Sequence, residues 1–238
     1  MTVAAPRMLF IHQTHTLIGT GEEQFEELYR DEWLPTLGTS DDIRLAWYLR
    51  HPAVVGESFT AITIIAVRNG DAWERLNARI DRGDLAALQA KTDSLRRGVA
   101  AKTLVPLPGW IHDLDFDEIP TTPGDHDPAL WIHDTLWPFE GKFDDYVARC
   151  GEFTHSLKSY ALAGHAYLEP MAGFRPAVGA GNGHEVCALS RITDANAWLH
   201  TAIHGLPAAS RDLGWGELAL RERWQTYLLN TPTWAPLW

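Results

Sequence analysis

Cysteine is scarce in this sequence, and positive charge is in deficit. Of 238 residues only Cys150 and Cys187 are cysteines, and they form no CxxC pair. A disulfide framework and a cysteine-based zinc site are therefore excluded. Lysine and arginine number 20 against 31 aspartates and glutamates, which gives a formal charge of −11. An acidic surface repels phosphate backbones, so we expect no nucleic-acid partner.

Long apolar segments and cofactor motifs are missing too. No run approaches 18 consecutive apolar residues, so we expect no membrane partner. Residues 1–7 lack the basic and then apolar pattern of a secretory signal, which favours a cytoplasmic location. The sequence contains no P-loop, Rossmann fingerprint, GxSxG or HExxH motif. We therefore expect neither a metal nor an organic cofactor.

What the sequence does have is a globular composition rich in tryptophan. Hydrophobic residues make up 45% of the chain, and 11 residues are tryptophan. Large aromatic side chains fill cores, and they also line pockets for flat organic ligands. The composition thus favours a small aromatic substrate as the binding partner.

An internal repeat is the most informative feature. The stretch Leu9–Thr14 reads LFIHQT, and Leu130–Thr135, 121 residues later, reads LWIHDT. Further along, Asp71-Ala-Trp73 matches Asn196-Ala-Trp198 in the same order. Matches in the same order at nearly constant offset indicate a duplicated domain. The predicted boundaries are residues 1–112 for the first repeat, 113–127 for an acidic linker and 128–238 for the second repeat.

Each repeat is predicted to alternate strands and helices in the order βαββαβ. In the first repeat we expect strands over residues 8–15, 43–50, 59–68 and 102–110, and helices over 21–37 and 72–95. In the second we expect strands over 129–136, 162–170 and 185–192, and helices over 139–157 and 194–204. An extra C-terminal helix is predicted over 215–229.

This order predicts an α+β fold of two tandem ferredoxin-like repeats. Each sheet carries helices on one face only, so the two sheets are expected to face each other and form an α+β barrel. The duplicated order, the first strand with its His and Thr, and the two Ala-Trp helix starts resemble the dimeric α+β-barrel superfamily, especially its NIPSNAP-like and EthD-like members. The resemblance covers nearly the whole chain.

The resemblance implies a range of activities without choosing one. The superfamily includes cofactor-free monooxygenases, polyketide cyclases, dehydratases, isomerases and lyases, and also haem proteins of the chlorite dismutase group. Fold alone does not select among these. Tryptophan-rich helices and an exposed sheet edge lead us to expect a homodimer.

The first strand of each repeat supplies the leading site candidates. Side chains alternate between the faces of a strand. One face carries an aromatic ring, a histidine and a hydroxyl in both repeats: Phe10, His12 and Thr14, then Trp131, His133 and Thr135. The sequence predicts that these residues point into the barrel, with His12 and His133 as a pseudo-symmetric pair. The alternative is two hydrogen-bonded core histidines.

The second strand of each repeat supplies further candidates. In the second repeat His165, Tyr167 and Glu169 share one face, as a polar and aromatic cluster. In the first repeat Tyr48 and Arg50 are predicted to face the cavity, where they could bind an oxyanion. A solvent-facing edge strand is the alternative for the second-repeat cluster.

These residues favour proton-transfer chemistry without a cofactor. Histidine titrates near neutrality and can act as acid or base, and a phenol can stabilise negative charge on oxygen. We predict a lyase or isomerase acting on an aromatic small molecule, for example by a C–C cleaving step that releases formaldehyde. His12 or His133 would remove the proton, with Tyr167 and His165 as further catalytic groups. A haem enzyme with an axial histidine and a non-catalytic binder of a hydrophobic metabolite are the alternatives.

Overall fold

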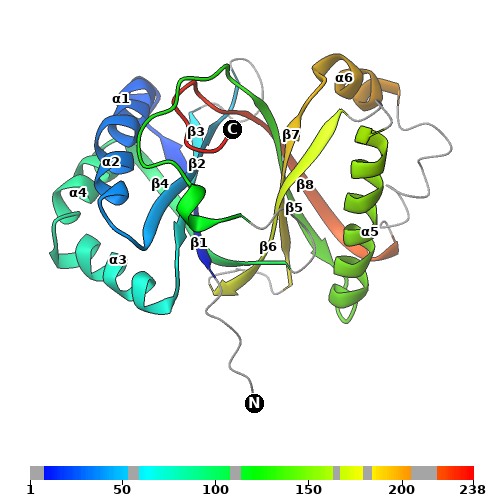
Figure 1. Ribbon diagram of the computed structural model, residues 1–238, viewed down its shortest axis with the longest axis horizontal. Helices are drawn as coiled ribbons and strands as arrows, with labels where there is room; N and C mark the ends of the chain where they lie inside the picture. Colours follow the sequence, from blue (N-terminus) through cyan, green and yellow to red (C-terminus); the bar gives the residue numbers. More distant parts are fainter. Residues whose placement is uncertain (1–7, 53–58, 108–113, 163–166, 179–183, 205–218) are drawn as a thin grey trace.

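The two repeats form the two halves of one barrel in the computed structural model (Figure 1), which describes residues 8–52, 59–107, 114–162, 167–178, 184–204 and 219–238. The first half contains strands β1 (Leu9–Leu17), β2 (Ile43–Arg50), β3 (Thr60–Val67) and β4 (Arg96–Pro106). Its helical segments are η1 (Gly19–Gly21), α1 (Glu22–Leu28), the π-helical turn η2 (Tyr29–Trp33), α2 (Leu34–Gly38), α3 (Gly70–Arg82) and α4 (Ala86–Ser94).

The second half repeats this order after a linker that contains the short helix η3 (Phe116–Glu118). It contains strands β5 (Leu130–Pro138), β6 (Leu168–Val178), β7 (Val186–Ile192) and β8 (Arg221–Asn230), and helices α5 (Phe143–Leu162) and α6 (Ala195–His204). The predicted fold class, two ferredoxin-like repeats forming an α+β barrel, is confirmed. No helix within the described ranges is long and apolar enough to cross a membrane.

The strands close in the order β1-β3-β2-β8-β5-β7-β6-β4. Pairing is extensive inside each half and narrow where the halves meet. Strand β4 pairs with β6 from Thr103 to Pro106, and the register between β2 and β8 consists of Arg50 opposite Asn230. The halves are therefore joined by two short seams, by side chains inside the barrel and by the C-terminal tail, whose Trp234 packs against Tyr48 of the first half.

The predicted C-terminal helix over 215–229 is wrong over residues 221–229, while residues 215–218 lie outside the described ranges. Residues Arg221–Asn230 form strand β8, which pairs with β5 from Leu130 opposite Asn230 to Pro138 opposite Arg221. The duplicated fold needs a fourth strand in its second half, and β5 would otherwise leave one edge of hydrogen-bonding groups unpaired. Tertiary pairing thus overrides the helical spacing of the local sequence.

The strand predicted over 162–170 was placed too far toward the N-terminus of the observed strand. Helix α5 continues to Leu162, and β6 begins at Leu168 and ends at Val178. Pairing with β7 fixes this register, because Glu169 lies opposite Arg191 and Phe174 opposite Cys187. The alternating polar residues on which the prediction rested therefore end at Glu169, near the start of the observed strand.

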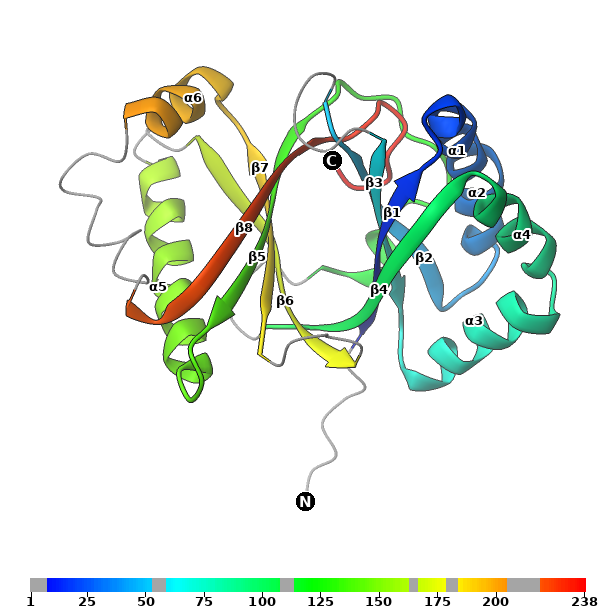
Figure 2. The ribbon, with the colours of Figure 1, turned by 180° about the vertical axis from the view of Figure 1, so that it is seen from behind.

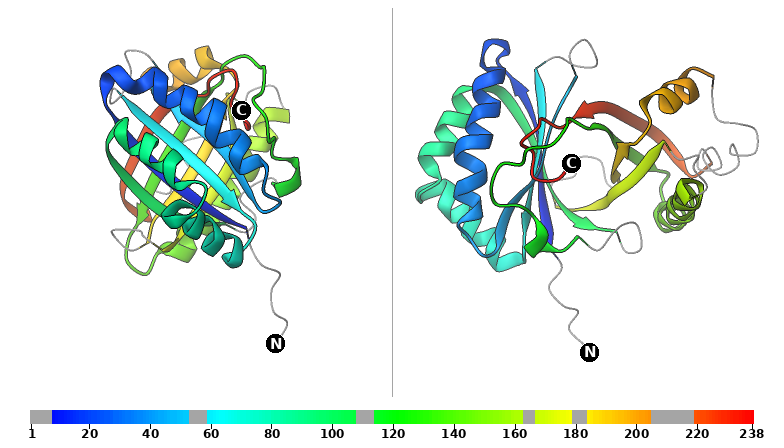
Figure 3. Two further views of the ribbon diagram at one scale, coloured as in Figure 1. Left: turned by 90° about the vertical axis from the view of Figure 1, so that its left-hand side faces the viewer. Right: turned by 45° about the horizontal axis from the view of Figure 1, so that its top comes forward.

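Three apolar cores result from the alternation of side chains along the strands. One core lies between the first-half sheet and helices α1 to α4, which cover that sheet in Figure 3, left, and it includes Phe25, Tyr29 and Trp33. A smaller core lies between the second-half sheet and helix α5, around Tyr146. The third fills the barrel interior and draws on both halves, with Phe10 and Trp131 among its members. The interior core is therefore where residues from the two repeats meet.

The linker and the C-terminal tail close one end of the barrel. Phe116 and Ile119 of the linker are buried in the interior core, and Leu237 of the tail packs against it. Both segments lie across the near end of the barrel in Figure 1 and in Figure 3, right. The described part of the predicted linker, from Leu114 onward, is thus a docked plug, and its Asp115, Asp117 and Glu118 are exposed.

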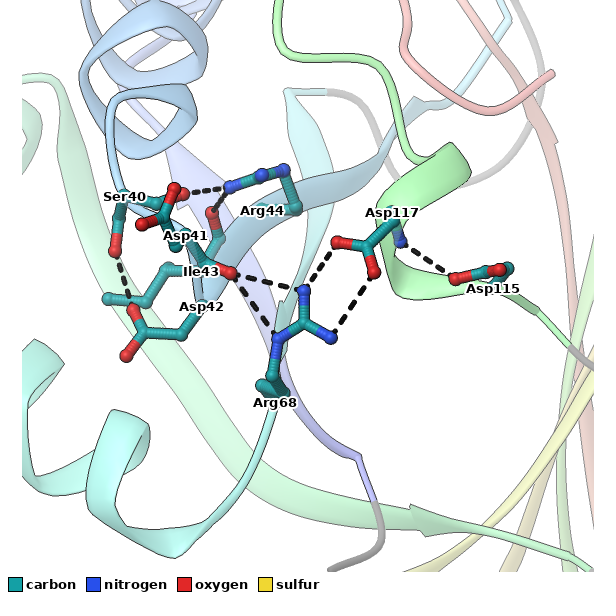
Figure 4. Close-up of polar contacts among 8 residues, drawn as sticks. All are labelled: Ser40, Asp41, Asp42, Ile43, Arg44, Arg68, Asp115 and Asp117. Carbon is teal, nitrogen blue, oxygen red and sulfur yellow. Dashed lines mark hydrogen bonds and ion pairs between the residues drawn. The ribbon is translucent and has the colours of Figure 1, made fainter.

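An ion-pair network anchors this plug to the ends of β2 and β3 (Figure 4). Arg68 pairs with Asp117 at 2.5 Å, and its guanidinium lies over the Phe116 ring at 4.3 Å. Arg44 lies over the same ring at 5.0 Å. The buried ring contributes most of the stabilisation, since Asp117 is largely exposed and exposed ion pairs contribute little.

Candidate functional site

The structure places the predicted residues of both first strands on the barrel interior. Phe10 and Trp131 belong to the interior core, while Leu9 and Ile11 pack on the helix side. His12, His133 and Thr135 are buried, and Thr14 is half-buried. The alternation deduced from the repeat is confirmed for these two strands.

The two repeats bring their histidines into direct contact. The Nε2 atoms of His12 and His133 lie 2.9 Å apart, and the rings are 2% and 3% exposed. One ring must donate and the other accept, so the two rings hold complementary tautomers. One carries hydrogen on Nε2 and a lone pair on Nδ1, and the other carries hydrogen on Nδ1.

Both Nδ1 atoms of this pair are buried without a hydrogen-bond partner. A buried polar atom without a partner is costly and calls for an explanation. The free lone pair on one ring can accept a proton, and the shared bond can pass a proton to the second ring, whose Nδ1–H can release one. The arrangement therefore suits proton transfer.

Both histidines are neutral at physiological pH. Burial, with lesser effects from His133 and Lys102, lowers the pKa of His12 well below its usual value. Burial and the charge of Lys102 lower the pKa of His133 to about 3. A neutral, desolvated imidazole keeps its lone pair available, and a negative charge created beside it would raise its pKa.

The predicted cavity position of Tyr48 and Arg50 is wrong. Tyr48 packs on the helix side against Phe25 and Tyr29, and Arg50 pairs with Glu26 at 2.7 Å. The cause is a β-bulge at Ala46, where the register with β3 shifts between Leu45 and Trp47. One extra residue reverses the facing of all that follow.

The same bulge turns Trp47 and Leu49 into the barrel. The second half repeats it between Pro170 and Ala172. Each bulge thus belongs to the duplicated unit. Pro170 is a local signal for the second-half bulge, but the sequence around Ala46 carries none.

Of the predicted cluster of His165, Tyr167 and Glu169, the two residues that the structure describes, Tyr167 and Glu169, do not meet the histidine pair. His165 lies outside the described residues. Tyr167 precedes β6, and Glu169 forms an ion pair with Arg191 at 2.6 Å. The residue of β6 in register with His133, through Leu189, is Ala172, so Tyr167 lies about 16 Å away along the strand.

Sequence reasoning missed the charged residues of the interior. Lys102 lies opposite His12 in the β1–β4 register, and its Nζ is 2.5 Å from Glu185 Oε1. Lys102 is 17% exposed and Glu185 8%, so the pair is largely removed from water. In the sequence, Lys102 stands alone at the end of a predicted strand. Its partner, Glu185, comes from the other half and could not be identified from the sequence.

Cys187 and Tyr227 complete the surroundings. Burial raises the pKa of Cys187 to about 11, so this buried thiol keeps its proton at neutral pH. Tyr227 of β8 lies opposite His133, with ring centroids 6.2 Å apart. Lys102 and Tyr227 thus occupy equivalent places in the two halves, and Tyr227 could not be found while β8 was predicted to be a helix.

Exposure along the interior face indicates the direction of access. On β1 the inward side chains pass from buried His12 through half-buried Thr14 to exposed Thr16. On β8 they pass from buried Leu229 through half-buried Tyr227 to exposed Gln225. This end of the barrel, where the interior side chains become exposed, lies opposite the plug and faces the viewer in Figure 2.

The histidine pair does not fit the axial ligation of a haem. The two Nε2 atoms face each other at 2.9 Å, which leaves no place for an iron atom and its porphyrin plane between them. The rings of Phe10, Trp47 and Phe174 also pack inside the barrel at centroid distances of 4.8 to 6.4 Å. Over the described ranges, no three acidic, cysteine or histidine side chains are placed to bind a metal ion.

Comparison with known proteins identifies the fold. The sequence matches no protein-family model and no curated protein. Among solved structures it resembles a monooxygenase-like protein from Lactobacillus acidophilus, with a TM-score of 0.60, 10% identity and coverage of 96% of this chain and 98% of that one. An anthrone oxidase-like protein matches at a TM-score of 0.61 and 8% identity, covering 96% and 92%.

A third similar structure is chlorite dismutase from Candidatus Nitrospira defluvii, at a TM-score of 0.55 and 10% identity, covering 95% of this chain and 92% of that one. At such low identity these likenesses establish the barrel fold. The reaction has to be argued from the site.

Proposed function

We propose that this protein is a cofactor-independent lyase or isomerase that removes a proton from an aromatic small molecule. The contact between His12 and His133 carries this proposal. Two neutral, buried imidazoles with free Nδ1 atoms are a proton acceptor and a proton donor joined by one bond. A purely structural pair would have both Nδ1 atoms hydrogen-bonded.

The proposed step begins with the ring whose Nδ1 carries a lone pair. That atom takes a proton from an acidic C–H or O–H of the substrate, and the electron pair moves onto a conjugated oxygen. The Nε2 hydrogen then passes to the second ring, whose Nδ1–H returns a proton to a different substrate atom. Return to carbon completes an isomerisation. In a lyase the anion first expels a neutral carbonyl fragment.

The low pKa of His133 does not oppose this role. The imidazolium forms together with a substrate anion in a desolvated interior, and that anion favours the protonated ring. Phe10 and Trp131 supply aromatic walls on the same face as the histidines. Aromatic walls and few polar groups are typical of small-molecule sites.

Oxygen insertion is a second candidate reaction for the same anion. The monooxygenase-like and anthrone oxidase-like proteins share the fold, and a substrate carbanion can also react with molecular oxygen. Proton removal by the histidine pair is common to both reactions. Oxygen consumption therefore distinguishes them.

We expect the purified protein to convert members of a panel of aryl ketones and phenolic alcohols without any added cofactor. Reactions analysed by mass spectrometry in air and under argon separate the candidates. An isomer or a cleavage fragment formed equally under argon supports the proposed function. A product heavier by oxygen, formed in air alone, replaces it with the oxygenase reaction. A Soret band in the spectrum of the active protein would contradict both.

A further inference from the structure

We propose that Lys102, held by Glu185, forms an anion site beside the histidine pair that takes the oxygen of a phenolate or enolate. The inference rests on the proposed function, since the anion is the one that the histidine pair generates. It names the substrate class as aromatic compounds whose carbonyl or hydroxyl oxygen is conjugated to the atom that loses the proton.

Geometry places the charge of Lys102 next to the pair. Lys102 and His12 are opposite one another on adjacent strands. The lysine charge acts on both imidazole rings, as the lowered pKa values of His12 and His133 record. An oxygen in contact with the ammonium would therefore also lie near the histidines.

The ammonium has donor capacity to spare. It carries three N–H donors. Glu185 Oε1 accepts from it at 2.5 Å, and the sulfur of Cys187 lies close enough to interact. The remaining N–H can be donated to a substrate oxygen. Glu185 together with Cys187 keeps the pKa of Lys102 raised in spite of burial, so the ammonium stays charged.

Two indole N–H groups near the pair point to the same kind of ligand. Trp47 and Trp131 are 2% and 0% exposed, and their Nε1 atoms have no hydrogen-bond partner. Ile64 of β3 lies opposite His12 on one side and opposite Trp47 on the other. Trp131 precedes His133 by two residues on the same strand. Both therefore lie within about 10 Å of the pair. Buried donors without acceptors favour a ligand that brings an oxygen.

The carboxylate of Glu185 has a role in this site. A lone buried ammonium would bind any anion tightly in its ground state. Once paired with Glu185, it binds stable anions less tightly than a lone ammonium would, and it retains a donor for charge that develops during the reaction. Only interactions stronger in the transition state accelerate the chemical step.

Binding of 4-nitrophenol tests the anion site without any turnover, since the phenolate absorbs visibly. We expect the wild-type protein to bind the phenolate form, so that bound nitrophenol ionises at lower pH than free nitrophenol. Lys102→Met is expected to weaken phenolate binding about tenfold or more. Glu185→Gln is expected to strengthen it, because the ammonium loses its competing partner.

Weaker phenolate binding in one variant and stronger binding in the other distinguish an anion site from an ion pair that only stabilises the contact between the halves. The double variant K102M/E185Q removes both charges and is the control for folding, checked by circular dichroism. The proposal would be overturned if K102M bound phenolate as tightly as the wild type does. It would also be overturned if K102M and E185Q both bound phenolate more weakly, or if the wild type bound none. His133→Gln should still bind nitrophenolate, so this result stands apart from the test of proton transfer.

Discussion

Replacing either His12 or His133 by glutamine is expected to lower kcat by about 10²–10⁴. Glutamine keeps a polar group near the Nε2 position, so the contact between the two side chains is largely preserved. It has no basic lone pair, however, and cannot pass a proton on. Because the two rings act as one unit, the double variant should be hardly slower than either single variant. Steady-state kinetics on a substrate identified from the panel measure this.

His200→Gln is the matched control, since His200 is exposed on helix α6. It should leave kcat unchanged. Losses that multiply in the double variant would show two independent residues and no relay. Unchanged kcat in both single variants, with the fold intact, would remove the pair from the mechanism.

The free energy of unfolding is expected to fall steeply as the pH drops below about 6.5. His12, His15 and His133 are buried as neutral rings, with the pKa of His15 lowered to about 3 by burial and by Arg96. In the unfolded chain each titrates near its ordinary value. Between these pKa values the unfolded state binds more protons, so each histidine removes up to about 1.4 kcal/mol of stability per pH unit.

For the three rings together the slope approaches about 4 kcal/mol per pH unit, against a total stability of about 5–15 kcal/mol. Urea unfolding between pH 7 and pH 5 measures this slope. Ordinary carboxylates have lower pKa values and contribute little over this pH range. Burial raises the pKa of Asp134, which acts in the opposite direction.

Comparing the wild type with His15→Gln isolates one ring, because Asp134 is common to both. In the variant the slope of unfolding free energy against pH should be smaller by about 1.4 kcal/mol per pH unit, which corresponds to one proton. His15 Nε2 lies 3.0 Å from Thr63 Oγ1, on the helix side and away from the proposed site. An unchanged slope would show that His15 is not buried neutral in the folded protein.

The duplicated strands explain why the histidine pair could be predicted. The repeat aligned His12 with His133, and the alternation of side chains placed both inside a barrel that the element order required. Both steps needed only the sequence and its internal repeat. The distance between the two rings could not be predicted in this way, because it depends on how the two halves close the barrel.

The remaining site residues depend on features with no local signal. The bulge at Ala46 reversed the facing of Tyr48 and Arg50. Strand β8 formed where helical spacing suggested a helix, because β5 supplied an edge to pair with. Lys102 and Glu185 come from different halves, so nothing in the sequence joins them.

The most direct test of the central claim follows hydrogen at the substrate carbon. The cofactor-free protein is incubated in deuterium oxide with the aryl ketones of the panel, and loss of the acidic C–H signal is recorded by proton NMR. The histidine pair predicts rapid exchange with the wild type and His200→Gln, and exchange at least about 10² slower with His12→Gln and His133→Gln. Exchange at the same rate in all four proteins, or none with any member of the panel, would contradict the assignment of this pair as the base.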